Sequence, residues 1–149
     1  MMLVKRLFFY NIILFLQCLE DVNLFANSNY PKLKALQRLF FTIYYAQNAV
    51  APFFDKILRS LVRFQRDEDK DIAFQVTLIA EIFGVFIDAG VYLPTILSQI
   101  NELEVTNTRT LVAYLTFLAS MIRFEVPKEI DYHLPSILKT LETIENNFK

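Results

Sequence analysis

Apolar positions recur at a helical period after three prolines in this chain. The stretches AVAPFFDKILRSL, VYLPTILSQINEL and YHLPSILKTLETI surround Pro52, Pro94 and Pro135, which stand 42 and then 41 residues apart. In each stretch, apolar residues follow the proline by two, six and nine positions, and these are Phe54, Leu58 and Leu61, then Ile96, Ile100 and Leu103, then Ile137, Leu141 and Ile144. Such offsets form one stripe on an α-helix, and proline is tolerated in a first helical turn. The chain therefore predicts an internal repeat whose helices begin near these prolines.

The same period extends to the N-terminal stretch. A step of 42 residues back from Pro52 reaches Tyr10, and the same offsets then fall on the apolar residues Ile12, Leu16 and Leu19. Long apolar segments at 30–47, 71–88 and 108–124 separate these units. The pattern predicts seven helices, at residues 3–24, 30–47, 50–66, 70–88, 92–104, 107–124 and 132–147, paired as antiparallel hairpins.

Polar residues at the expected helix starts agree with these boundaries. Ser28 or Asn29, Asn48, Asp69 or Asp71, and Thr106 or Asn107 are residue types that cap helix N-termini. Gly90 is expected to end the helix before it in a left-handed conformation, and Pro127 is expected to stop the helix that contains Arg123.

The fold expected from this pattern is all-α. A helix-hairpin period near 41 residues is typical of HEAT and armadillo repeats, which stack into a right-handed α-α superhelix. The segment LPTILSQINEL…TNTRTLVAYLTFLASMI resembles a HEAT unit, with Arg109 in the place of the arginine that opens the second helix. We expect one domain over residues 1–149 with about three and a half hairpins, and the alternative of a fragment of a longer solenoid stays open.

A second resemblance rests on Ala51-Pro52 and on IAEIFGVFID, residues 79–88. Over roughly residues 8–123 the chain resembles the middle domain of the eukaryotic initiation factor 4G family, and within it the scaffold of nonsense-mediated mRNA decay. The resemblance implies a scaffold that binds RNA helicases, decay factors and in some cases RNA. The alternative is a general HEAT-repeat adaptor in another intracellular assembly, such as transport, ciliary or chromatin complexes.

Composition argues against catalysis and against a cofactor or metal. The chain has one histidine, His133, and one cysteine, Cys18, so it offers no zinc ligand set and no internal disulfide. Its two glycines stand alone, so it has no phosphate-binding loop. We interpret the acidic turn RDEDKD, residues 66–71, as a solvent-exposed turn between two helices. We expect a non-enzymatic protein in a reducing compartment, the cytoplasm, with the nucleus as the other option.

A basic surface is the candidate binding site. With 15 basic and 16 acidic residues the net charge is -1, so only a local patch could attract RNA. We hypothesise that seven cations on two neighbouring helices form such a patch for RNA or an acidic partner, the basic patch: Lys32, Lys34, Arg38, Lys56, Arg59, Arg63 and Arg66. Tyr44 or Tyr45 could stack on bases, and the alternative is an ordinary polar face. Glu81, inside an apolar helix, is expected to face solvent or Arg123.

The stretch LFFYNIILFLQC, residues 7–18, has features of a signal peptide, but its apolar core is too short to span a bilayer. We interpret it as the first repeat helix and expect no membrane partner. Leu14 and Phe15 stand where the other units carry Lys56, Ser98 and Lys139, and Ile57, Gln99 and Thr140. They are therefore a candidate apolar contact surface, to be covered by a partner, by a second copy in a homodimer, or by the residues before them.

Overall fold

The computed structural model describes residues 13, 17, 20–21, 29–104 and 106–147, and within these residues it contains helices and no strand. The helices are α2 (Asn29–Ala46), the 3-10 helix η1 (Gln47–Phe53), α3 (Phe54–Leu61), the 3-10 helix η2 (Val62–Phe64), α4 (Lys70–Phe86), α5 (Ala89–Asn101), α6 (Thr108–Ile122) and α7 (Pro127–Asn147). The helix expected at residues 3–24 lies outside the described residues, so the expected number of seven is untested.

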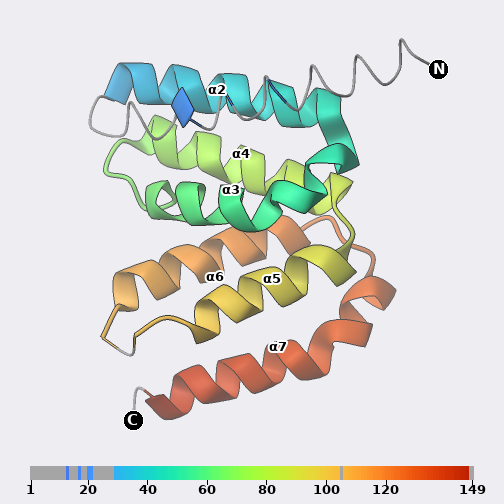
Figure 1. Ribbon diagram of the computed structural model, residues 1–149. Coiled ribbons are helices and arrows are strands. Elements are labelled where there is room, and N and C mark those ends of the chain that lie inside the picture. Colours follow the sequence, from blue (N-terminus) through green and yellow to red (C-terminus); the bar gives the residue numbers. More distant parts are fainter. Residues whose placement is uncertain (1–12, 14–16, 18–19, 22–28, 105, 148–149) are drawn as a thin grey trace, which may run out of the picture.

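The helices are arranged in two layers (Figure 1). The first layer stacks α3, α5 and α7, and the second layer stacks α2, α4 and α6. Successive helices alternate between the layers, so α5 with α6 forms a hairpin and α3 with α4 forms another. This alternation confirms the all-α hairpin repeat that the 41-residue period predicted.

The core lies between the two layers, and the periodic stripe explains it. In α3 the side chains of Phe54, Leu58 and Leu61 are buried, and in α5 those of Ile96 and Ile100 are buried. Ile137 and Ile144 of α7 are partly buried against the same core. The stripe deduced from the sequence is therefore the inward face of α3 and α5, whereas in α7 Ile137 and Ile144 face the core and Leu141 is exposed.

Gly84 lets α4 and α6 approach closely. A Cβ atom built on Gly84 would stand 2.7 Å from the carbonyl carbon of Met121, which belongs to the backbone of α6. No side chain larger than hydrogen fits there, because a backbone group cannot turn away as a side chain can. The spacing of the second layer thus depends on this glycine.

The prolines occupy different places from those expected. Pro94 lies inside α5 and Pro135 inside α7, whereas Pro52 lies inside η1, one residue before Phe53. The expected helix starts at 92 and 132 were too late, because α5 begins at Ala89 and α7 at Pro127. Pro127 therefore opens a helix instead of stopping one, as proline can at a first helical position. α7 changes direction in its N-terminal third (Figure 1), which an internal proline explains.

The capping residues were predicted with mixed success. Asp69 and Asn107 cap α4 and α6, and their side chains accept hydrogen bonds from the backbone N–H groups of Asp71 and Thr110. The expected role of Gly90 was wrong, because Asp88 caps α5 by accepting the Gly90 N–H at 2.7 Å and the preceding helix ends at Phe86. Asn48 caps no helix, since α3 begins after Phe53. Gln47, with φ of 53°, takes the left-handed turn after α2 instead.

Candidate interaction site

Lys32 of the basic patch lies inside the protein. Lys32 is only 5% exposed. Its Nζ donates a hydrogen bond to Asp67 Oδ2 at 2.8 Å and lies 5.0 Å from the centroid of the Phe64 ring. The ammonium group therefore joins α2 to the turn that precedes α4. It offers no charge to a partner at the surface.

Asp67 is held in its ionised form by this contact. Burial by itself would raise the pKa of the Asp67 carboxyl, but the hydrogen bonds from Lys32 and from the Asp69 backbone N–H lower it, with help from the charges of Lys32 and Arg109. The net result is a pKa below the usual value for aspartate. The Asp67 carboxyl is therefore ionised at physiological pH.

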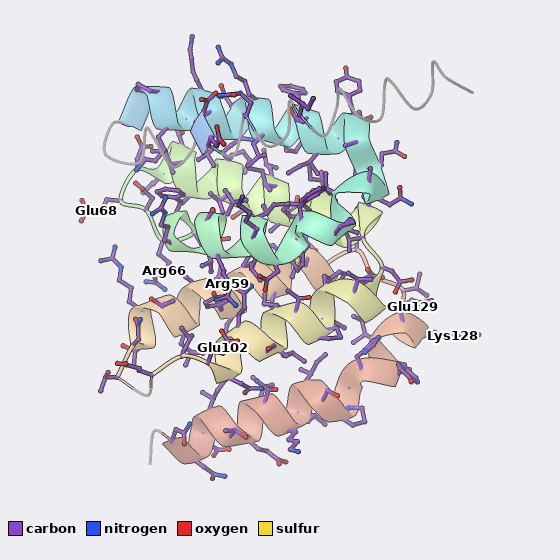
Figure 2. All side chains as sticks on the ribbon, in the orientation of Figure 1. Arg59, Arg66, Glu68, Glu102, Lys128 and Glu129 are labelled. Carbon is purple, nitrogen blue, oxygen red and sulfur yellow. The ribbon has the colours of Figure 1, made fainter. Side chains whose placement is uncertain are left out.

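Arg59 of the basic patch is matched by two carboxylates. Its Nη2 lies 3.2 Å from Glu102 Oε2 at the end of α5, and its Nε lies 3.3 Å from Asp55 Oδ2 on α3. Arg59 and Glu102 point toward each other in Figure 2. The hydrogen bonds to Glu102 and Asp55 raise the pKa of the guanidinium. The contact links neighbouring first-layer helices and locally cancels the positive charge.

Arg63 and Arg66 of the basic patch line two hollows that both include Arg109, and only the hollow of Arg63 contains acids. The Arg63 guanidinium stacks on Phe64 at 4.6 Å, and Arg63 lines a shallow hollow with Arg109 and the acidic turn. Arg66 lines a neighbouring hollow with Arg109, Thr108 and Val112. Lys34, Arg38 and Lys56 are exposed on α2 and α3. The seven residues thus do not form one surface of uniform positive charge, and RNA binding by them stays a prediction.

Tyr44 and Tyr45, the expected stacking groups, lie far along α2 from Lys32. Twelve residues of helix separate Lys32 from Tyr44, which corresponds to about 18 Å. Tyr44 meets Phe86 of α4 edge-on, with ring centroids 6.0 Å apart. Tyr45 is exposed. These rings therefore belong to the end of the second layer where α4 also ends.

A pocket at that end of the molecule combines exposed apolar side chains with acids. It is formed by the end of α4, the start of α5 and the connection between α6 and α7, and its volume is about 560 Å³. Val85, Phe124 and Val126 line it and are 59%, 61% and 59% exposed. Three carboxylates line it as well, those of Asp88, Glu125 and Glu129, together with Asn48, Gly84, Phe86, Ile87 and Ala89. We call this site the turn-edge pocket.

The acids of the turn-edge pocket are held by the fold to different degrees. Asp88 caps α5, and Glu125 Oε1 accepts the Tyr92 hydroxyl at 3.0 Å. Burial, reinforced by the hydrogen bond to Glu125, raises the pKa of Tyr92, so its phenol stays protonated and keeps donating. Glu129 in the first turn of α7 points outward (Figure 2). The described lining includes no lysine or arginine, so the pocket favours a cationic ligand group.

The sequence analysis missed the turn-edge pocket, although a signal was present. The run Phe124-Glu125-Val126 places two large apolar side chains in a connection between helices, where polar residues are usual. Helical periodicity cannot detect such a run, because it lies outside the periodic segments. Only the stacking of the helices brings Val85 and Asp88 beside Phe124 and Val126.

A second groove, between α5 and α7, is lined mainly by polar side chains. Its volume is about 540 Å³, and its lining includes the only histidine, His133, with Glu102, Lys139 and the hydroxyls of Ser98, Ser136, Thr140 and Thr143. His133 meets Tyr132 edge-on at 5.0 Å between ring centroids. No group of three His, Cys, Asp or Glu side chains that could hold a metal occurs among the described residues.

Other expectations concern Glu81 and the N-terminal stretch. Glu81 Oε1 accepts a hydrogen bond from Arg123 Nη1 at 2.9 Å, as predicted. Leu14 and Phe15 lie outside the described residues, but the equivalent positions of the other units are informative. Those matching Leu14 are exposed, whereas those matching Phe15 (Ile57, Gln99 and Thr140) are buried.

Among the helices that the structure describes, none has the length and apolar character needed to cross a membrane.

Comparison with known families gives one match. The family described as dynein axonemal assembly factor 5, HEAT-repeat domain, matches residues 2–148. No curated protein and no solved structure matches the chain. The match agrees with the two-layered hairpin stack and supports the HEAT-repeat class, but it gives no support to the resemblance to the initiation factor 4G middle domain.

Proposed function

The chain belongs to the HEAT-repeat domain family of dynein axonemal assembly factor 5, and on that premise we propose that it is a non-enzymatic protein-interaction scaffold in the assembly of axonemal dynein. The observation that carries this proposal is the family match over residues 2–148. Of the two roles expected from the sequence, it favours the general adaptor in its ciliary form over the mRNA-decay scaffold.

Several finer features belong to the same proposal. The hairpins form a right-handed superhelix, because repeated α-hairpins with a constant small rotation produce one. The protein works in the cytoplasm, consistent with a single cysteine that needs no oxidising environment. It binds other proteins through side chains that the stack leaves uncovered.

The turn-edge pocket is the surface that we propose for partner binding. Its three large apolar side chains are more than half exposed and adjacent, an arrangement typical of protein interfaces. The carboxylates around it would attract a basic segment and set its orientation. We therefore expect a partner segment that offers an apolar side chain next to a lysine or arginine.

Affinity purification with mass spectrometry tests the proposal. The tagged chain is expected to recover axonemal dynein chains or other dynein assembly factors from its own cells. The double variant Phe124→Ser with Val126→Ser is expected to lose them, since both side chains are exposed and their loss spares the core. Phe74→Ser is the matched control, because Phe74 is 62% exposed on α4 and does not line the pocket.

Two results would contradict the proposal in different ways. Recovery of mRNA-decay or translation factors, with no dynein component, would replace the assembly role with the alternative drawn from the initiation factor 4G resemblance. Equal recovery of dynein components by the chain and by the double variant would keep the role and remove the turn-edge pocket from it.

A further inference from the structure

α7 carries an apolar stripe that nothing described in the structure covers. Leu134, Leu138 and Leu141 are 41%, 49% and 43% exposed. They are spaced by four and three residues, so they lie along one side of the helix. We call these three residues the α7 stripe. It lies beside the inward-facing Ile130, Ile137 and Ile144, which pack against the core.

The repeat shows that the α7 stripe occupies positions that are covered elsewhere. Leu141 follows its proline by six residues, as do Leu58 of α3 and Ile100 of α5, which are 0% and 4% exposed. Leu134 precedes its proline by one residue, as does Leu93 of α5, which is fully buried. The same pattern of apolar residues is therefore enclosed in one unit and open in the other.

Neighbouring helices account for the difference. α5 lies against α6, its partner in the other layer, and also against α7, with which Leu93 lines a groove. The segment of α3 and η2 likewise lies against α4, through η2, and against α5. α7 packs against α5, and no helix that the structure describes follows it as a hairpin partner. An occupant of the α7 stripe would thus continue an interface that the stack already uses. Because that interface joins helix to helix, the occupant is a helix.

The charges beside the stripe specify the occupant further. Asp131 stands three residues before Leu134, Glu142 four after Leu138, and Glu145 four after Leu141, so all three flank the exposed leucines. All three are exposed. Lys139 lies on the other side of α7, in the groove toward α5. The border of the stripe is therefore acidic, and it complements lysine or arginine on a partner.

We propose that the α7 stripe docks an amphipathic α-helix of a partner protein, with its apolar face on the three leucines and basic residues beside Asp131, Glu142 and Glu145. The inference rests on the scaffold role proposed above and names the chemistry of one partner. The docked helix lies alongside α7 as the neighbouring helices of the stack lie alongside α5.

A binding measurement with a synthetic probe tests the proposal. The probe is a fluorescent peptide of about 18 residues, roughly five helical turns, with leucines on one face and lysines beside them. A second peptide carries glutamate in place of each lysine. Fluorescence anisotropy with the full chain is expected to show saturable binding of the lysine peptide. The glutamate peptide is expected to bind at least about tenfold more weakly.

Variants of the chain locate the binding. The double variant Leu138→Gln with Leu141→Gln is expected to weaken binding of the lysine peptide by about tenfold or more. The reason is that glutamine side chains gain less than leucine side chains when the docked helix buries them. Both side chains are exposed, so the fold should tolerate the change, and circular dichroism checks this. Tyr132→Gln is the matched control. Tyr132 is 83% exposed on another side of α7, and its loss is expected to leave the affinity unchanged.

Four outcomes would overturn the proposal. The lysine peptide could bind the double leucine variant as tightly as the unaltered chain, or it could fail to bind the unaltered chain. Sedimentation could instead show a dimer that Leu138→Gln with Leu141→Gln dissociates, which would make a second copy the occupant. If the double leucine variant still recovers all dynein assembly components, this inference fails while the proposed function stands.

Discussion

At the scale of single residues, the ion pair between Lys32 and Asp67 fastens α2 to the turn before α4. Nζ and Oδ2 are 2.8 Å apart, and the two side chains are 6% and 16% exposed. We predict that Lys32→Met lowers the free energy of unfolding by about 2 kcal/mol, because Asp67 then stays partly buried without its counter-ion. Urea unfolding followed by circular dichroism measures this.

Arg38→Met provides the control for Lys32→Met, since Arg38 is exposed on the same helix and its loss should change stability by less than about 0.5 kcal/mol. The effect of Lys32→Met should also depend on pH. The folded-state pKa of Asp67 lies below its unfolded value of about 3.9, so the pair stabilises the protein above that pH and loses its effect as the pH falls through the folded-state pKa. An equal difference between the two proteins at pH 7 and at pH 2.5 would contradict this account.

At the scale of elements, Gly84 sets the distance between α4 and α6. A Cβ atom at this position would stand 2.7 Å from the Met121 carbonyl carbon, so the helices must separate to admit it. We predict that Gly84→Ala lowers the free energy of unfolding by about 3 kcal/mol, although alanine favours a helix more than glycine does. Thermal unfolding gives the value.

The second glycine serves as the comparison for Gly84→Ala. A Cβ atom on Gly90 would stand 3.1 Å from Asp88 Oδ1 and 4.0 Å from His133 Nε2, both of them side-chain atoms. Gly90→Ala should therefore change the stability by less than about 1 kcal/mol. If both alanine variants unfolded at the same temperature, close packing at Gly84 would not be the cause of the loss.

At the scale of the whole molecule, Gln99 joins three helices through one buried and two partly buried hydrogen bonds. Its Nε2 donates to Asp55 Oδ1 of α3 at 2.8 Å and to the Asp55 carbonyl at 3.1 Å, and its Oε1 accepts the Tyr114 hydroxyl of α6 at 2.7 Å. We predict that Gln99→Leu lowers the free energy of unfolding by about 2 kcal/mol, because the Tyr114 hydroxyl then has no acceptor in a buried site. Denaturant unfolding measures the loss.

A double-mutant cycle separates the hydrogen bond from packing. Tyr114→Phe alone leaves Gln99 Oε1 without its donor, whereas Gln99→Leu with Tyr114→Phe removes both polar groups. The double variant should therefore be more stable than the sum of the two single losses implies, by about 1 kcal/mol. Strict additivity would show that the two side chains act independently.

The candidate sites were less accessible to sequence analysis than the fold. Lys32 and Arg59 are ordinary surface cations by sequence pattern, and only their partners show otherwise. Asp67 is 35 residues from Lys32, and Glu102 is 43 residues from Arg59. The turn-edge pocket likewise draws on residues from α4 to α7. Helical periodicity carries no information about which distant groups will meet, so these pairings could not be deduced.

The sequence by itself determined the helical hairpins, their period and the inward stripes. The reason is that apolar residues recur about every 3.6 positions along the buried face of a helix, and this spacing can be recognised within each segment. It also limited the caps of α4 and α6 to two candidates each, and of these Asp69 and Asn107 accept hydrogen bonds from backbone groups two and three residues away. Only the tertiary structure decided that Pro94 and Pro135 lie beyond the first turn of their helices, that Gly84 meets the backbone of α6, and that the α7 stripe is left open. Each of these depends on how one layer of helices stacks on another, and stacking joins residues that the local pattern treats as unrelated.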